Sequence, residues 1–317
     1  MEQELIVSQS GDGDFQTIME AVNAIPYGMP ARVFIKRGVY REKLFVEKCE
    51  LEMIGEGAEN TILTFADGAY HLHPDGRQYG TFRSYTAFFG GEHILVKNVT
   101  VQNTAGDGRT AGQGIAAYVD AKRAYFENVH LLGFQDTLFT APLPPTPRIP
   151  GSFIGPRGKT PRNRSMQYYK NCFIRGDIDF IFGGADAVFQ DCEIFSNDRG
   201  EAINGYVAAP CTPQDGLGYL FLDCRLCSDA MSGTVFLGRP WREYAKAAYL
   251  DCAMGAHIAS TGWDNWSNPE NEKTTYFAEY HSIGPGAGKA RAFGAQLSEQ
   301  EAANDRRLAE ELRCSVI

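Results

Sequence analysis

The chain has 317 residues, enough to form one large domain with a sizeable core. Its net charge of −9 and its sequence pI of about 5.2 argue against a nucleic-acid-binding protein, which would carry a basic face. No stretch approaches the roughly 20 consecutive apolar residues that a membrane-spanning helix needs. We therefore expect a single domain over residues 1–317, monomeric and without nucleic-acid or membrane partners.

The N-terminal segment predicts a short capping helix. A turn cluster at 10–14 precedes apolar residues that recur at helical spacing from Phe15 to Ile25, and Asp14 is placed as the N-cap. The first residues lack the basic and apolar regions of a secretory signal. We expect a cytoplasmic protein from the sequence as written, or a secreted one if a signal has been removed.

A short motif then recurs along most of the chain. It consists of Asn or Asp, then Val or Cys, then a variable residue and an apolar one, and it begins at Asn98, Asn128, Asn171, Asp191, Asp223 and Asp251. Most steps are roughly 20 to 32 residues, which is typical of a solenoid with one coil per repeat. Because the alternation has a period of two, we predict a β-solenoid in which the Asn/Asp positions stack as a turn ladder and the Val/Cys positions face inward. A β-sandwich with regularly spaced strands is the alternative.

One step of the repeat is longer because it contains a Pro-rich segment at 141–164, which we interpret as a loop insertion on one coil. Near the C-terminus, the segment from Ser298 to Arg313 is rich in helix formers and predicts a surface helix. Cys224 and Cys227 form a CxxC, but no second pair accompanies them, and strand alternation points the two thiols to opposite faces. We therefore expect no zinc site at these two cysteines.

Two aspartates occupy matching places in the repeat. Asp136 lies eight residues after Asn128, and Asp179 lies eight residues after Asn171. Since adjacent strands lie about 4.8 Å apart, we expect the two carboxyl groups to face each other at roughly 5 Å. Two like charges this close should raise the pKa of one group and lower that of the other, giving a protonated acid and an ionised nucleophile.

Three further polar residues complete a candidate site. Arg239, in Leu237-Gly238-Arg239-Pro240-Trp241, is a candidate to hold the ionised aspartate. The amides of Gln113 and Gln135 are candidates to stabilise a developing oxyanion. Each motif alone is also compatible with a purely structural role, but their combination favours catalysis.

These motifs resemble those of the pectin methylesterase (pectinesterase) family of carbohydrate esterases. The match includes Gly38-Val39-Tyr40-Arg41-Glu42, Gly112-Gln113-Gly114, Gly133-Phe134-Gln135-Asp136-Thr137, Asp179-Phe180-Ile181-Phe182-Gly183 and Leu237-Gly238-Arg239-Pro240-Trp241. The resemblance implies an all-β, right-handed parallel β-helix that needs no metal or cofactor. It also implies the following roles: Asp179 as nucleophile, Asp136 as acid and then base, Gln113 and Gln135 as the anion hole, Arg239 positioning Asp179, and Phe134, Phe182 and Trp241 lining the sugar groove.

The reaction expected from the resemblance is hydrolysis of galacturonate methyl esters in pectin or its oligomers, with release of methanol. Two alternatives are a glycan-cleaving β-helix enzyme, since carboxylates about 5 Å apart also suit retaining glycosidases, and a non-catalytic carbohydrate-binding solenoid. From the overall acidity we further expect the protein to accept neutral, methylated galacturonate better than the anionic product.

Overall fold

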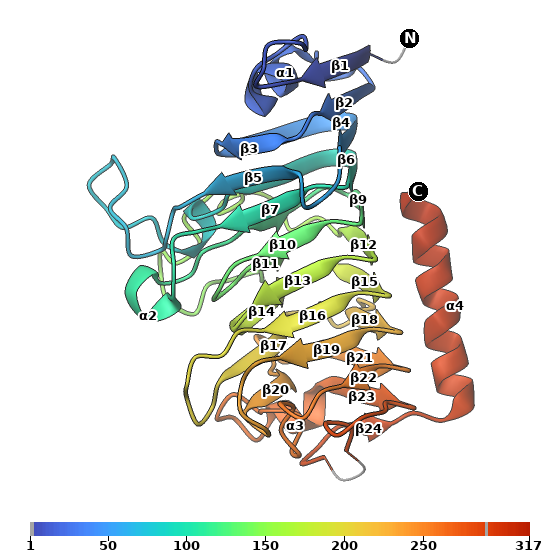
Figure 1. Cartoon of the computed structure of the whole chain (residues 1–317). Coiled ribbons are helices and arrows are strands. Elements are labelled where there is room, and N and C mark those ends of the chain that lie inside the picture. Colours follow the sequence, from blue (N-terminus) through green and yellow to red (C-terminus); the bar gives the residue numbers. More distant parts are fainter. Residues whose placement is uncertain (1–2, 289–290) are drawn as a thin grey trace.

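The computed structural model describes residues 3–288 and 291–317, and most of its regular structure is β-strand. Within this part of the chain, all pairs of named strands are parallel, and each pairs mainly with strands one coil before and after it. His130, for example, lies opposite Thr100 on one side and Phe173 on the other. The chain therefore winds as a parallel β-helix, with coils stacked from the N-terminal to the C-terminal end (Figure 1).

The strands form three faces. The first face contains β8 (Ala117–Val119), β11 (Leu138–Thr140), β14 (Ile178–Gly183), β17 (Gly205–Pro210) and β20 (Val235–Gly238). The second contains β1 (Gln3–Val7), β2 (Ala31–Ile35), β9 (Arg123–Glu127), β12 (Met166–Lys170), β15 (Asp186–Gln190), β18 (Tyr219–Leu222), β21 (Lys246–Leu250), β23 (Tyr276–Tyr280) and β24 (Ala295–Gln296). The long strands β4 (Leu44–Gly55) and β6 (Ala87–Lys97) belong to both faces and join them into one sheet.

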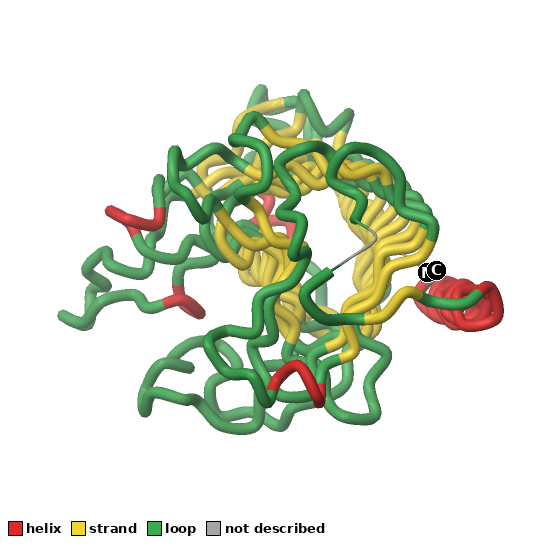
Figure 2. Tube along the Cα trace, turned by 90° about the horizontal axis from the view of Figure 1, so that it is seen from below, coloured by secondary structure: helices red, strands yellow, loops and turns green. Residues whose placement is uncertain are grey.

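A separate sheet makes the third face. Its strands are β3 (Gly38–Arg41), β5 (Thr61–Phe65), β7 (Thr100–Asn103), β10 (His130–Leu132), β13 (Phe173–Gly176), β16 (Glu193–Ser196), β19 (Arg225–Ser228) and β22 (Ala253–Met254). Seen along the stack, the strands of successive coils superpose around the interior (Figure 2). The main apolar core fills this interior over the length of the solenoid.

The predicted turn ladder and inward column are confirmed. The six Asn/Asp positions of the repeat have φ between 51° and 56°, in the left-handed region that Asn and Asp tolerate better than other side chains. The residues that follow them are all buried, each at most 4% exposed: Val99, Val129, Cys172, Cys192, Cys224 and Cys252. His281, with φ 48°, continues the ladder at a position where the sequence motif does not reveal it.

Helices cover one end and one side of the solenoid. At the N-terminal end, α1 (Ile18–Ala24) buries Ile18, Ala21 and Val22, and it lies at the top of the stack (Figure 1). The prediction of Asp14 as N-cap was wrong: Thr17 caps the helix in a capping box with Glu20, because Asp14 instead accepts a hydrogen bond from the Ile6 amide at 2.8 Å.

The C-terminal helix was predicted correctly. α4 (Glu299–Val316) begins after the N-cap Ser298 and packs along the outside of the second face (Figures 1 and 2). The other helices are single turns in loops: η1 (Thr81–Arg83), α2 (Gly108–Ala111) and α3 (Asn271–Thr274). In the described part of the chain, none of the helices is both long and apolar enough to cross a membrane.

The Pro-rich segment 141–164 connects β11 to β12 and contains neither helix nor strand. It lies against the outer surface of the first face, where Leu143 and Phe153 join an apolar cluster with Phe82, Phe139 and Phe182. Because this cluster forms outside the coil, the insertion adds a second layer to the first face.

Candidate active site

Asp136 and Asp179 lie at the same position on neighbouring coils, as their matched offsets predict. Leu138 pairs with Ile181 in adjacent strands β11 and β14, and the Asp136 amide donates to the Ile178 carbonyl at 3.0 Å. Both residues are 7% exposed and line one cleft of about 350 Å³ on the outside of the first face. The two carboxyl groups therefore share one partly enclosed site.

The backbone at both aspartates departs from regular strand geometry. Asp136 has φ 65° and Asp179 has φ 50°, both in the left-handed region. The pairing of β14 with β17 also shifts register between Ile178 and Ile181, which marks a β-bulge around Asp179. As a result, the consecutive residues Phe180 and Ile181 both reach the inner core, and strand alternation no longer determines where Asp179 lies.

Arg239 holds Asp179 through two hydrogen bonds. Its Nε donates to Oδ1 at 2.8 Å and its Nη2 donates to Oδ2 at 2.7 Å, the two-pronged geometry that a guanidinium makes with a carboxylate. The guanidinium lies between two aromatic rings, 3.8 Å from the centroid of Tyr206 and 3.9 Å from that of Trp266. Both carboxylate oxygens of Asp179 are thus held by a group that is itself fixed by its neighbours.

The two aspartates have different electrostatic environments. Burial, and next the charge of Asp179, raise the pKa of Asp136 well above its usual value. Burial also raises the pKa of Asp179, but the charge and the hydrogen bonds of Arg239 oppose that rise. The prediction that one pKa would fall was wrong, because desolvation outweighs Arg239 and Asp264 adds a further negative charge. The two groups nevertheless remain unequal, since Asp136 lacks a hydrogen-bonded cation and its proton is held more strongly.

Gln113 and Gln135 also line this cleft. Gln113 belongs to the coil before that of Asp136, and Gln135 directly precedes Asp136 in the chain. Gln113 lies between α2 and β8, and the Gly114 amide next to it donates to the Gln135 carbonyl at 3.0 Å. Across the described residues, neither side-chain amide makes a hydrogen bond to another protein group. Both amides are therefore available to donate to a ligand.

The predicted groove aromatics are only partly brought together. Phe182 and Trp241 line the cleft with ring centroids 5.7 Å apart. Phe134 is half-buried and is not among the lining residues. Gly183, at the end of the second aspartate motif, has φ 134°, and a Cβ there would lie 2.0 Å from the Thr140 carbonyl oxygen. The motif therefore needs glycine at this position for the close approach of two coils.

Several residues of the cleft were not anticipated from the sequence. The insertion contributes Arg148, Ile149, Ser152 and Phe153, the loop after β20 contributes Arg242, and the segment between β22 and α3 contributes Trp266. Arg242 directly follows the Arg-Pro-Trp motif, which was a usable signal. Trp266, by contrast, is 27 positions beyond Arg239, and no pattern in the sequence links the two.

The arrangement is suited to acyl transfer. One carboxylate is held by an arginine and is available as a nucleophile, a second carboxyl group favours its protonated form, and two free amides lie alongside. No group of three or more His, Cys, Asp or Glu is positioned to hold a metal ion within residues 3–288 and 291–317.

Comparisons of the sequence with protein families and with individual proteins find the same family. A family model described as Pectinesterase matches residues 4–143 and 162–304 and leaves out residues 144–161, inside the insertion. Pectinesterase 31 of Arabidopsis thaliana is 32% identical over 291 residues, covering 89% of this chain and 83% of that protein.

Solved structures agree. A pectin methylesterase in complex with a hexasaccharide has a TM-score of 0.79 and 27% identity, covering 94% of both chains. The pectin methylesterase from carrot has a TM-score of 0.77 and 28% identity, covering 94% of this chain and 89% of that one. The predicted fold, a right-handed parallel β-helix, is confirmed.

Proposed function

Since the chain belongs to the pectinesterase family and is therefore a carboxylic ester hydrolase acting on pectin methyl esters, we propose that it does so with Asp179 as nucleophile and Asp136 as acid and base. The substrate in this proposal is methyl-esterified galacturonate in the polymer or in its oligomers. A solved relative was crystallised with a hexasaccharide, which supports a carbohydrate chain as the ligand.

The proposed reaction has two steps. An oxygen of the Asp179 carboxylate attacks the C6 carbonyl carbon of the ester, and Gln113 and Gln135 donate hydrogen bonds to the oxyanion that forms. The bond to the methoxy group then breaks, and Asp136 gives its proton to the departing methanol. The product of this step is an anhydride between galacturonate and Asp179.

In the second step, water attacks the galacturonyl carbon of the anhydride. Asp136, now ionised, takes the proton of the water, and the bond to Asp179 breaks. Galacturonate leaves with a free carboxylate, Asp179 is again ionised and Asp136 is again protonated. Arg239 stabilises the ionised form of Asp179 at the start and end of the cycle, because its two hydrogen bonds require an acceptor.

The observation that carries the proposal is the unequal pair of buried carboxyl groups in one cleft. Asp179 has two hydrogen bonds from Arg239, whereas burial and Asp179 raise the pKa of Asp136. A nucleophile and an acid are needed together for the first step, and this pair supplies both.

The test is release of methanol from methylated tri- to hexagalacturonates by the wild type and by Asp136→Asn and Asp179→Asn. We expect methanol without new reducing ends from the wild type and none from either variant. Asp223→Asn is a matched control, because Asp223 shares the left-handed φ but lies exposed on the turn ladder. New reducing ends without methanol would instead indicate a glycosidase, and full activity in either active-site variant would refute the assigned roles.

We infer that the protein acts as a monomer consisting of one domain, and that it needs no cofactor. Its compartment, cytoplasmic or extracellular, stays a prediction that fractionation of the producing cells would test.

A further inference from the structure

Gly108, the first residue of α2, lies directly against the side chain of Gln135. A Cβ atom at position 108 would lie 2.6 Å from Oε1 of Gln135 and 3.1 Å from its Cβ. Non-bonded heavy atoms pack favourably at about 3.5–4.0 Å, so both distances are too short for a real contact. The space that a side chain would need at position 108 is therefore already occupied by Gln135.

This contact also orients the amide of Gln135. Oε1 is the atom of the side chain nearest to position 108 and Cδ follows at 3.5 Å, so Nε2 is turned further from α2. Gln135 lines the cleft, whereas Gly108 does not. Only Nε2 carries hydrogens to donate, and an Oε1 turned into the cleft would repel an oxyanion. The packing therefore keeps the acceptor end of the amide at α2 and leaves the donor end for the cleft.

The backbone itself does not require glycine at position 108. Gly108 lies outside the left-handed region, unlike its neighbours Gly106, with φ 110°, and Gly112, with φ 70°. Alanine is a better helix former than glycine at such a position, because glycine loses more conformational freedom on folding. The local structure thus favours a side chain, and the contact with Gln135 is what excludes it.

α2 is held in place at both of its ends. At its last residue, the Ala111 carbonyl accepts a hydrogen bond from the Tyr70 amide at 3.0 Å, and Ala111 is 1% exposed. At its start, the N-cap Asp107 accepts a hydrogen bond from the Arg109 amide at 2.7 Å. Because a single helical turn has few internal hydrogen bonds, contacts of this kind determine its position.

Arg109 also ties α2 to a distant coil. Its guanidinium pairs with Asp107 at 2.6 Å and with Glu201 at 3.3 Å. Glu201 lies in the loop between β16 and β17, whereas α2 precedes β8. On the first face β8 and β17 are separated by β11 and β14, so the pair spans the two coils that carry the catalytic aspartates. When a side chain is added at position 108, the flexible end of Gln135, rather than α2, is therefore the part that moves.

We propose that Gly108 is a positioning residue for the reaction, and that its missing side chain fixes the direction in which the Gln135 amide donates. The inference rests on the proposed function, in which Gln135 is one of two oxyanion donors, and identifies what orients that donor. Arg109 contributes to the same role because it holds α2 against Gln135. Oxyanion donors are most effective when they are fixed before the charge develops. Displacing Gln135 should therefore slow the chemical step and leave substrate binding nearly unchanged.

The first experiment measures kcat and KM for methanol release by Gly108→Ala. We expect kcat about 10- to 100-fold lower with little change in KM, since a misplacement of about 1 Å costs up to about 10²-fold. Gly28→Ala is the matched control, because Gly28 also lies outside the left-handed region and a Cβ there would have no described heavy atom within 4 Å. Both variants should melt at or above the temperature of the wild type, as neither replacement strains the backbone. An unchanged kcat in Gly108→Ala would overturn the proposal.

A double-mutant cycle tests whether the loss acts through Gln135. In Gln135→Ala the far end of the side chain is absent, so a Cβ added at position 108 has no amide to displace. Gly108→Ala should then cause no further loss, and kcat of the double variant should equal that of Gln135→Ala alone. A loss of the same size in both backgrounds would contradict the assigned role.

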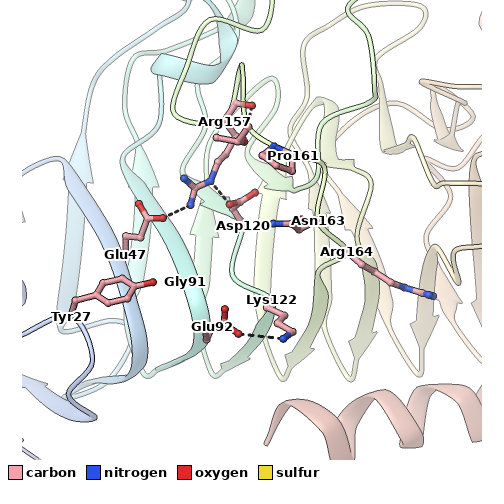
Figure 3. A pocket seen from close by; sticks show the side chains of 11 residues that line it. Tyr27, Glu47, Gly91, Glu92, Asp120, Lys122, Arg157, Pro161, Asn163 and Arg164 are labelled. Carbon is pink, nitrogen blue, oxygen red and sulfur yellow. Dashed lines mark hydrogen bonds and ion pairs between the residues drawn. The ribbon is translucent and has the colours of Figure 1, made fainter.

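The contribution of Arg109 is tested by its own variants. Arg109→Gln should lower kcat about 2- to 5-fold, the range for a half-exposed ion pair, and Arg109→Lys should restore part of that loss. Lys122→Gln is the matched control, because Lys122 pairs with Glu92 at 3.4 Å in a separate cavity of about 580 Å³ (Figure 3). The two ion pairs are similarly exposed, but that of Lys122 lies outside the cleft, so its loss should leave kcat unchanged. Equal kcat values for Arg109→Gln and Lys122→Gln would overturn the part assigned to Arg109.

The last measurement needs no turnover. Crystal structures of the wild type and of Gly108→Ala should show α2 in the same place and the Gln135 side chain in a different rotamer. If the wild type releases no methanol but Gln135 moves as expected, the proposed function fails and the positioning by Gly108 stands. If methanol is released while neither kcat nor the Gln135 rotamer changes in Gly108→Ala, the positioning fails and the proposed function stands.

Discussion

The contact between Arg239 and Asp179 gives the sharpest test of the site. In Arg239→Lys the positive charge remains, but an ammonium group replaces the planar fork that now donates at 2.8 and 2.7 Å to the two oxygens of Asp179. The stacking of the guanidinium between Tyr206 and Trp266 is lost as well. A hydrogen bond to a charged group contributes about 1.5–3 kcal/mol, so loss of one of the two corresponds to roughly a 10- to 150-fold lower kcat/KM.

The pH dependence separates the possible causes of this loss. Arg239 lowers the pKa of Asp179, so a weaker contact leaves that pKa still higher. Only the ionised carboxylate attacks, and the variant should therefore lose activity at a higher pH than the wild type when the pH is lowered. The difference in kcat/KM between the variant and the wild type should become smaller as the pH rises, until deprotonation of Asp136 limits the activity of both.

The assay is kcat/KM for methanol release over the full pH range in which the protein stays folded. Asp177→Asn is the control, because burial raises the pKa of Asp177 to about 6, and its titration could otherwise be mistaken for that of the catalytic pair. If kcat/KM of Arg239→Lys is reduced by the same factor at every pH, the electrostatic role of Arg239 is refuted. Arg239 would then act only by positioning the Asp179 side chain.

Three further outcomes follow from the same structure. Asp136→Asn should abolish turnover and raise the melting temperature at neutral pH. Folding raises the pKa of the Asp136 carboxyl group, so this group stabilises the fold at low pH and loses that contribution as the pH rises. The amide of asparagine does not ionise and therefore avoids the loss of stability at neutral pH. Gln113→Leu and Gln135→Leu should each lower kcat about 10²- to 10³-fold with a small change in KM, as measured by methanol release, if the amides act mainly on the oxyanion. In the turn ladder, Asn171→Ala should lower the free energy of unfolding in urea by about 1–2 kcal/mol because Asn171 has φ 51°, whereas Asn171→Gly should cost less.

The fold was largely predictable because the same local turn structure recurs in successive coils of the solenoid. Each Asn or Asp that tolerates a left-handed turn is followed by a small buried residue, and this combination recurs where the coils stack. Where a different residue meets the same requirement, as His281 does, the motif disappears although the turn remains. The N-cap of α1 was missed for a similar reason, since Asp14 and Thr17 are both suitable caps and tertiary contacts with Ile6 decide between them.

The site was predictable where it follows the repeat and not where it depends on loops. Asp136 and Asp179 come together because the coils stack in register, and their offsets from the ladder state this directly. Trp266 and Arg148 reach the cleft through irregular segments whose path is determined by packing, such as the burial of Phe153. Periodicity carries no information about such segments, and the lining they provide could be found only in three dimensions.

The same conformational tolerance serves both the scaffold and the chemistry. On the ladder, a left-handed Asn or Asp turns the chain, and its side chain makes polar contacts outside the coil, such as the ion pair of Asp251 with Arg306. At positions 136 and 179 the residue must again accept a positive φ, of 65° and 50°, but now it must also present a carboxyl group to the cleft. Aspartate meets both requirements, since glycine lacks the carboxyl group and glutamate, as an ordinary side chain, is disfavoured in the left-handed region. The bulge at Asp179 then frees its side chain from strand alternation while Phe180 and Ile181 keep the core filled. In this repeat the reactive pair is thus built with a bulge at one aspartate and a half-buried arginine that directly follows β20, two strands along the same face.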